Sequence, residues 1–174
     1  GGGRQSLEKW MVQNIAHPKD NNRPWSFKGH EYQQGIIRDT HPWVVTQKCA
    51  QSGVSELSLS VALGLMAILP NSNIIYVLQN ARYARVFAAS RFDPAIQKSD
   101  RLKAIVDRDV DSTSLKKIGS SFLHITGGHS DSSAISIPAS ALIVDEASFI
   151  SPGVLGTFSS RLEHLKEEEK ILYH

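Results

Sequence analysis

The sequence is short of cysteine, of net charge and of long hydrophobic runs. Its single cysteine, Cys49, excludes an internal disulfide and any metal site built from several cysteines, and it fits an intracellular setting best. The formal net charge of +2 provides no strong electrostatic attraction for a polyanion. The most apolar run, Leu57–Leu69, is too short to cross a bilayer and includes two serines and a glycine, so no membrane partner is expected. These absences favour a soluble globular domain.

The sequence does contain short apolar segments that are separated by helical ones. With 174 residues, the chain is long enough for one domain with a sizeable core. Strands made of continuous apolar residues are typical of a parallel sheet that is covered on both faces. The sequence therefore predicts a three-layer α/β fold with a mainly parallel central sheet. The expected strands are 43–47, 74–78, 141–144 and a last one that begins at Ile171, and the expected helices are 6–15, 31–38, 55–69, 81–90, 95–106 and 160–169.

Turn residues complete this outline. A loop is expected over 17–29, and Asp93-Pro94 is expected to break the helix that precedes it. Leu115–Ile118 and Phe122–Ile125 are expected to form a hairpin around Gly119-Ser120.

Several other polar or flexible residues have a plain interpretation. Two adjacent lysines on a strand, Lys116 and Lys117, are expected to be exposed to solvent. His124 and His129 lack partners at the spacing of metal ligands, so they are expected to be satisfied polar positions. The opening Gly1–Gly3 is interpreted as a remnant of cloning and is left out of the fold.

The segment Thr46–Leu59, TQKCAQSGVSELSL, has the outline of a phosphate-binding loop between a strand and a helix. The usual pattern of such a loop is G-x-x-x-x-G-K-[ST]. Gly53 occupies the second glycine position and Ser55 the hydroxyl position. The first glycine position holds Lys48, whereas Val54 stands where the lysine belongs. The loop therefore has a lysine, but at its start.

Elementary chemistry permits this exchange. Backbone N–H groups of residues 50–55 can form an anion-binding nest whatever their side chains are. Gly53 lets the backbone approach a phosphate closely, and the Ser55 hydroxyl can bind Mg²⁺. Lys48 is long enough to reach over the same phosphates from the strand side. The plain alternative is a strand–helix turn in which Ser55 caps the helix and Glu56 favours its dipole.

A second motif, ALIVDE over 141–146, places two carboxylates directly after an apolar strand. Ligands of open α/β sheets bind at the carboxyl ends of the strands. Asp145 would hold Mg²⁺ directly or through water, and Glu146 would polarise the attacking water as a general base. The plain alternative is an acidic turn in solvent. Two such motifs in this order, about 90 residues apart and each on a predicted buried strand, favour a nucleotide hydrolase.

Together these residues resemble the ATPase domain of the large terminase subunit of tailed phages, the motor that packages DNA into a procapsid. The motifs follow the family's order: EYQ with a glutamine that reads adenine (Gln33, or Gln34), VVTQKCAQSGVSE as a variant Walker A, and ALIVDEAS as Walker B. In one branch of the family the loop reads K-x-A-x-x-G-x-S, which residues 48–55 fit position by position. The resemblance implies a P-loop NTPase fold of the ASCE or RecA-like type, with ATP and Mg²⁺ as cofactors. It implies nucleotide binding by Gln33, Lys48, Cys49, Ala50, Gln51, Ser52, Gly53, Val54, Ser55 and Glu56, catalysis by Lys48 and Glu146, and Mg²⁺ binding by Ser55 and Asp145.

The resemblance covers about Glu31 to the C-terminus and divides the chain accordingly. Residues 1–30 are interpreted as the cloning remnant and an N-terminal extension, and 31–174 as the P-loop ATPase domain. The sequence stops where a coupling motif is expected, so we interpret the domain as truncated and the family's nuclease domain as absent. The family implies double-stranded DNA, a portal protein and a small terminase subunit as partners, a homo-oligomeric ring, and the cytoplasm of the host cell.

One departure from the family and two alternative functions stay open. Family members often place an arginine before Walker B that acts on a neighbouring subunit's ATP, yet 125–140 contains none, which leaves Arg161 or Arg108 for that role. A superfamily 2-type helicase or translocase ATPase would share the strand–loop–helix arrangement. A degenerate P-loop module would bind partners without hydrolysing ATP.

Overall fold

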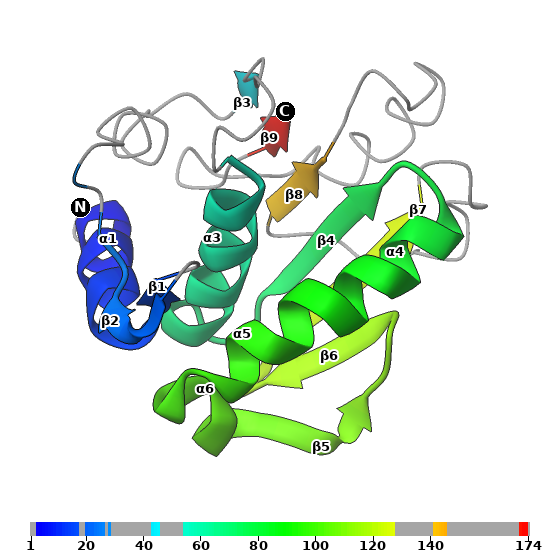
Figure 1. Ribbon diagram of the computed structural model, residues 1–174. Coiled ribbons are helices and arrows are strands. Elements are labelled where there is room, and N and C mark those ends of the chain that lie inside the picture. Colours follow the sequence, from blue (N-terminus) through cyan, green and yellow to red (C-terminus); the bar gives the residue numbers. More distant parts are fainter. Residues whose placement is uncertain are drawn as a thin grey trace.

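The computed structural model describes residues 3–17, 20–26, 28, 43–45, 54–127, 141–145 and 171–173. Figure 1 shows helix α4 in front of the central sheet and helix α3 between the sheet and helix α1. The elements are α1 (Gly3–Asn14), β1 (Ala16–His17), β2 (Asp20–Pro24), β3 (Trp43–Val45), α3 (Val54–Ile68), β4 (Asn73–Leu78), α4 (Ala81–Phe87), the π-helix η1 (Ala88–Phe92), α5 (Asp93–Gln97), α6 (Asp100–Ile105), β5 (Val106–Asp111), β6 (Leu115–Ile118), β7 (Ser121–Gly127), β8 (Ala141–Val144) and β9 (Ile171–Tyr173).

In the described part of the chain, seven strands form one sheet in the order β3-β9-β8-β4-β7-β6-β5. Neighbouring strands run parallel from β3 to β7 in this order, whereas β6 and β5 extend the sheet as antiparallel strands. The mainly parallel sheet that the sequence predicts is therefore confirmed. The hairpin between β6 and β7 is confirmed too, and Gly119 turns it with a φ of 59°, which glycine adopts without strain.

The sheet is buried on both faces around β4. Ile74, Tyr76 and Leu78 belong to the hydrophobic core that the sheet shares with α3 and α4. Ile75 and Val77 alternate with them, so they point to the opposite face, and both are fully buried. Burial on two faces is the physical reason for a strand without polar alternation.

Helix α3 is also buried on several sides, as expected from its apolar sequence. Every residue from Leu57 to Gly64 is buried. A side chain at Gly64 would overlap Leu7 and crowd Trp10. This glycine therefore lets α1 pack closely against α3, on the side that faces away from the sheet in Figure 1.

The helix after β4 does not break at Asp93-Pro94, so that prediction is wrong. α4 passes into η1 and then into α5, and the connecting residues keep helical backbone angles. Pro94 lies in the first turn of α5, where its missing N–H costs little. The helix expected over 95–106 is interrupted instead at Ser99, whose side chain caps α6 by accepting from the Leu102 N–H at 3.2 Å.

Two polar strand segments also differ from the expectation. β1 and β2 pair as an antiparallel hairpin where a loop over 17–29 was expected. β5 forms one edge of the main sheet, and its three aspartates alternate along the strand. Aspartate is uncommon in strands, but an edge strand lets charged side chains reach solvent. The helices expected over 31–38 and 160–169 lie outside the described residues.

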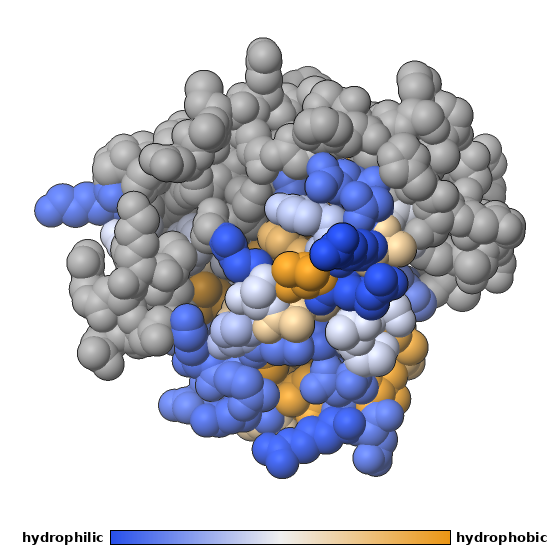
Figure 2. All heavy atoms as spheres, turned by 45° about the vertical axis from the view of Figure 1, so that its right-hand side comes forward, coloured by the Kyte–Doolittle hydropathy of each residue, from blue (hydrophilic) through white to orange (hydrophobic). Residues whose placement is uncertain are grey.

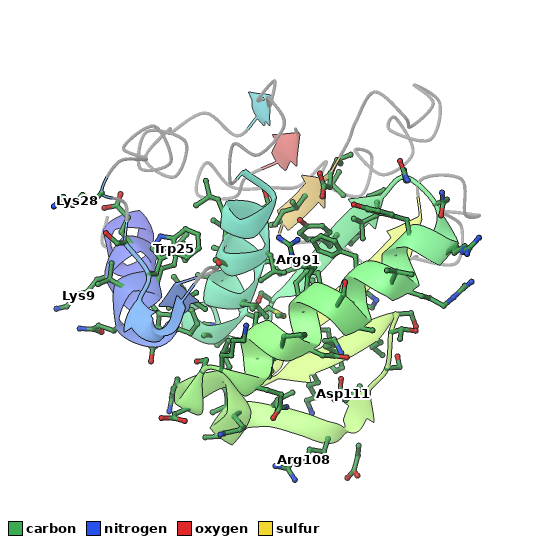
Figure 3. The ribbon with its side chains drawn as sticks, in the orientation of Figure 1. Lys9, Trp25, Lys28, Arg91, Arg108 and Asp111 are labelled. Carbon is green, nitrogen blue, oxygen red and sulfur yellow. The ribbon has the colours of Figure 1, made fainter. Side chains whose placement is uncertain are left out.

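Lys116 is buried, contrary to the expectation of exposure. Its Nζ lies 2.5 Å from Asp93 Oδ1 and 2.6 Å from Asp111 Oδ1, and it donates to the Ser112 carbonyl at 3.1 Å. A lysine is tolerated in a core because the charge is paired and hydrogen-bonded. Asp111 ends β5, next to β6, as Figure 3 shows. Lys116 therefore joins the β5–β6 hairpin to the start of α5.

The outer side of α4 is solvent surface of mixed character. Arg82 and Arg85 are exposed there, together with Tyr83 and Val86, which expose 38% and 56% of their surface. Figure 2 shows strongly hydrophilic and apolar atoms side by side on this face. The inner side of α4 contributes Phe87 and a neighbouring alanine to the core.

Candidate functional site

The start of α3 lies at the same edge of the sheet as the carboxyl ends of β4 and β8. β4 and β8 run parallel, with Ile74 opposite Ala141 and Val77 opposite Val144. α3 begins at Val54, a short connection after β3, which runs parallel to β9 and through it to β8. Figure 1 shows the start of α3 and the tips of both strands at the upper side of the molecule. This is the edge where parallel α/β sheets bind ligands.

Asp145 is a buried carboxylate at this edge. It directly follows β8 and exposes 2% of its surface, and its backbone N–H donates to the Val77 carbonyl at 2.8 Å. Ala141 and Ile143 belong to the core on the α3 side of the sheet. Because side chains alternate along a strand, Asp145 falls on the same side. The predicted place of Asp145, at the end of a buried strand, is confirmed.

Tyr76 brings a phenol hydroxyl to the same side of the sheet. It is completely buried, and its ring stacks on Phe87 at 5.7 Å and meets the edge of Phe92 at 5.2 Å between centroids. Burial raises the pKa of Tyr76 well above its usual value, and the negative charge of Asp145 adds to this effect. The side chain of Ser58 on α3 works against this rise in the pKa of Tyr76, whose hydroxyl makes no hydrogen bond with the described residues.

Tyr76 is the residue of this site that sequence reasoning missed. The strand reads IIYVL, and the tyrosine was counted as an apolar residue of a continuous apolar strand. Its hydroxyl was the available signal, because a polar atom in a strand that is buried on both faces needs a partner.

A close approach of backbone brings β7 and α4 together at the same edge. A side chain at Gly127 would overlap the backbone of Asn80 and Ala81. Asn80 caps α4 by accepting from the Tyr83 N–H at 2.8 Å. The end of β7 and the start of α4 therefore form one tightly packed corner beside β4.

The structure describes part of the predicted nucleotide site. Val54, Ser55 and Glu56 form the first turn of α3, so Ser55 lies inside the helix and does not precede it as a cap would. This helix after a strand confirms the strand–loop–helix order around the loop. The other predicted site residues lie outside the described residues: Gln33, Lys48, Cys49, Ala50, Gln51, Ser52, Gly53 and Glu146.

Arg108 is far from this edge within one chain. It is exposed on β5, and β4, β7 and β6 lie between β5 and β8. Figure 3 shows its side chain pointing away from the sheet. A role for Arg108 at this chain's own Asp145 is therefore excluded. Arg161 lies outside the described residues.

Other polar features of the described part carry no further site chemistry. No helix there is long and apolar enough to cross a membrane, and no group of three or more His, Cys, Asp or Glu there is arranged to hold a metal ion. His124 pairs with Ile75, so it lies on the face opposite Tyr76. Its Nε2 is buried without a partner in the described part, so the expectation of a satisfied position is wrong. Burial lowers the pKa of His124.

A comparison with protein families identifies a family that covers most of this chain. The family described as phage terminase large subunit gpA, ATPase domain, matches residues 22–156, which is more than half of the 174-residue chain. No curated protein sequence matches the chain.

Solved structures of phage terminases share the fold. The large terminase of bacteriophage HK97 has a TM-score of 0.79 and 10% identity over 98% of this chain and 37% of its own. A large terminase of a thermophilic bacteriophage, solved in complex with ADP, has a TM-score of 0.62 and 10% identity over 86% of this chain and 38% of its own. The ATPase domain of a Thermus phage large terminase has a TM-score of 0.55 and 19% identity over 83% of this chain and 64% of its own. This chain thus spans well under half of the first two proteins.

Proposed function

This chain belongs to the family of phage terminase large subunit ATPase domains, and from that premise we propose that it binds and hydrolyses ATP to drive the packaging of double-stranded DNA. The observation that carries the proposal is the buried Asp145 at the carboxyl end of β8, on the side of the sheet that α3 covers. Ligands of parallel α/β sheets bind at this edge, where a carboxylate can hold the metal ion of a nucleotide. The start of α3 lies at the same edge and offers backbone N–H groups to an anion.

The residues at this edge fit a magnesium ion. Mg²⁺ prefers oxygen ligands and is usually held by one or two protein groups together with substrate phosphates. Asp145 supplies a carboxylate, and Ser55 in the first turn of α3 supplies a hydroxyl group. We assign the ion to these two residues. Bound there, Mg²⁺ would polarise the phosphate oxygens.

The remaining roles fall to residues of the loop and of the turn after β8. Lys48 reaches over the β- and γ-phosphates, and Gln33 reads the adenine. The backbone of residues 50–55 cradles the phosphates. Glu146 accepts a proton from water as the water oxygen attacks the γ-phosphorus, and the bond to the bridging oxygen breaks to leave ADP and phosphate.

The partners in this proposal belong to the complete motor. Double-stranded DNA is the cargo, a portal protein is the docking partner, a small terminase subunit selects the DNA, and several copies of the chain form a ring in the host cytoplasm. The likeness to large terminases of known structure supports this setting at the level of fold. An arginine from a neighbouring copy would then reach the phosphates, and the exposed Arg108 is free to serve there.

A substitution in the loop tests nucleotide binding. Lys48→Ala should weaken the binding of a non-hydrolysable ATP analogue about tenfold or more, because a charged hydrogen bond to phosphate is lost. Titration calorimetry measures this affinity, and Gln51→Ala in the same loop is the neutral control. An unchanged affinity in Lys48→Ala would support the degenerate binding module instead.

A second substitution separates hydrolysis from binding. In the full-length protein, Glu146→Gln should lower turnover about a hundredfold or more and leave ATP affinity nearly unchanged, because only the general base is removed. Phosphate release and calorimetry measure the two quantities. A parallel loss of both, or of neither, contradicts the role of Glu146.

A further inference from the structure

The Tyr76 hydroxyl is a fully buried polar group for which the described residues offer no hydrogen bond. Such orphan groups are rare in folded proteins, because each loses its hydrogen bonds to water and gains nothing in return. Such a group is explained when a bound state of the protein supplies the hydrogen-bond partner that the free protein lacks. The residues around Tyr76 indicate which partner that is.

Three elements meet around this hydroxyl. Ser58 comes from α3, Tyr76 from β4 and Asp145 from the end of β8, and all three are buried. Asp145 follows by two residues Ile143, the partner of Tyr76 on the neighbouring strand, so the two side chains lie diagonally on the same face of the sheet. Ser58 lies one helical turn after Ser55, the residue to which we assign the metal together with Asp145. Tyr76 therefore lies on the same side of the sheet as Asp145 and α3.

The ring of Tyr76 is held on two sides. Phe87 stacks on it and Phe92 meets it edge to face, at 5.7 and 5.2 Å between centroids. Phe87 and Phe92 also contact each other at 5.5 Å, so the three rings form one cluster. A ring packed in this way keeps its hydroxyl in one place. The Asp145 carboxylate directly follows β8, beyond the last paired residue of that strand.

We propose that Tyr76 is a positioning residue for Asp145, whose carboxylate accepts a hydrogen bond from the Tyr76 hydroxyl when Mg²⁺ and nucleotide are bound. One carboxylate oxygen then faces the phenol and the other faces the site. This inference rests on the proposed function. A tyrosine hydroxyl carries its proton at neutral pH, so it can donate this hydrogen bond.

Nucleotide binding with and without the metal tests this role. Calorimetry with ADP, once in Mg²⁺ and once in EDTA, is carried out on the wild-type chain and on Tyr76→Phe. The variant should bind ADP about tenfold more weakly in Mg²⁺ and equally well in EDTA, because only the metal-bound arrangement uses the hydroxyl. Tyr83→Phe removes a hydroxyl from an exposed tyrosine on α4 and should change neither affinity.

Two further measurements separate positioning from a structural role. In the Asp145→Asn background, Tyr76→Phe should cause no additional loss of ADP affinity in Mg²⁺. The melting temperature of ligand-free Tyr76→Phe should equal or exceed that of the wild type, because an orphan hydroxyl is removed. A lower melting temperature, or equal losses in Mg²⁺ and EDTA, overturns the inference.

The inference and the proposed function can fail separately. If the wild type binds ADP with Mg²⁺ and Tyr76→Phe binds it equally well, Tyr76 has no positioning role and the ATPase proposal stands. If the wild type shows no Mg²⁺-dependent ADP binding, both are overturned.

Discussion

At the amino end of β4, buried hydroxyl groups are tied into hydrogen bonds, whereas at its carboxyl end a buried hydroxyl lacks a partner among the described residues. Ser121 accepts from the Ser72 N–H at 3.1 Å, lies 2.8 Å from the Ser72 hydroxyl, and donates to the Leu69 carbonyl at 2.8 Å. Tyr76 has no such bond, although Asp145 lies near it. The buried hydroxyl groups at the amino end of β4 therefore have hydrogen-bond partners, whereas the hydroxyl group of Tyr76, towards the carboxyl end, has none among the described residues.

We interpret the hydrogen-bonded groups at the amino end of β4 as contributing to stability, and the unbonded hydroxyl group towards its carboxyl end as contributing to function. Polar groups that bond to each other hold the residue after α3 to the start of β7, and their hydrogen bonds are made within the protein. A buried hydroxyl group without a hydrogen bond to the described residues, such as that of Tyr76, lowers the stability of the free protein and is retained where a bound state uses it. Four experiments break or sharpen this comparison.

The largest expected effect comes from Asp145, at the edge of the sheet where β4 and β8 end. In the full-length protein, Asp145→Asn should lower Mg²⁺-dependent turnover about a hundredfold or more, because the carboxylate that we assign to the metal is lost. The shape of the side chain is kept, so the protein should still fold. Phosphate release measures turnover, and Asp109→Asn at the exposed edge strand should leave it unchanged. Full activity of Asp145→Asn would contradict our assignment of the metal.

The next effect concerns packing at the same end. Gly127→Ala should lower the free energy of unfolding by about 3 kcal/mol, because the added methyl group overlaps the backbone of Asn80 and Ala81. Gly119→Ala should cost only about 1 kcal/mol, since it strains a positive φ but meets no atom within 4 Å. Urea unfolding measures both. Equal losses would mean that β7 and α4 are not closely packed.

A smaller effect is expected at the amino end of β4, where the buried hydroxyl groups are hydrogen-bonded. Ser121→Ala should lower the free energy of unfolding by about 2 kcal/mol, because a buried hydroxyl that makes several hydrogen bonds is lost. Ser120→Ala, its exposed neighbour, removes one acceptor from the Asn71 N–H and should cost about 0.5 kcal/mol. ADP affinity should not change in either variant. A changed affinity would show that the two ends are not independent.

The smallest effect is a dependence of stability on pH. Burial lowers the pKa of His124 from its usual 6.5, so the folded protein takes up this proton at lower pH than the unfolded chain. As pH falls from 6.5 towards the folded pKa, the unfolded chain binds more protons and the free energy of unfolding decreases. Above that window His124 has no effect. Urea unfolding at about pH 7.5 and about pH 5.5 should show a smaller acid loss in His124→Gln than in the wild type.

The sequence predicted the centre of the sheet better than its margins. IIYVL and ALIV are continuous apolar runs because β4 and β8 are buried on both faces, so local pattern and tertiary environment agree. β5, with its alternating aspartates, gave no such signal, because an edge strand takes its side-chain chemistry from solvent. The expected break at Pro94 was wrong because a proline in a first turn does not stop a helix.

The candidate site was predicted in part for a similar reason. Asp145 stood out because a charge directly after an apolar strand is conspicuous in sequence. Tyr76 did not, because its importance lies in which elements surround it, and that is decided by contacts between α3, β4 and β8. The burial of Lys116 was missed likewise, since its partner Asp93 is distant in the sequence.

The Lys116 ion pairs also govern how the molecule opens. If the β5–β6 hairpin left the sheet alone, Lys116 would lose Asp93, and if α5 left alone, the buried ammonium group of Lys116 would keep only one of its two carboxylate partners, Asp111. Hairpin and helix should therefore open as one cooperative unit. In amide hydrogen exchange, the backbone of β6 and of α5 should become accessible at the same rate, although one is strand and the other helix.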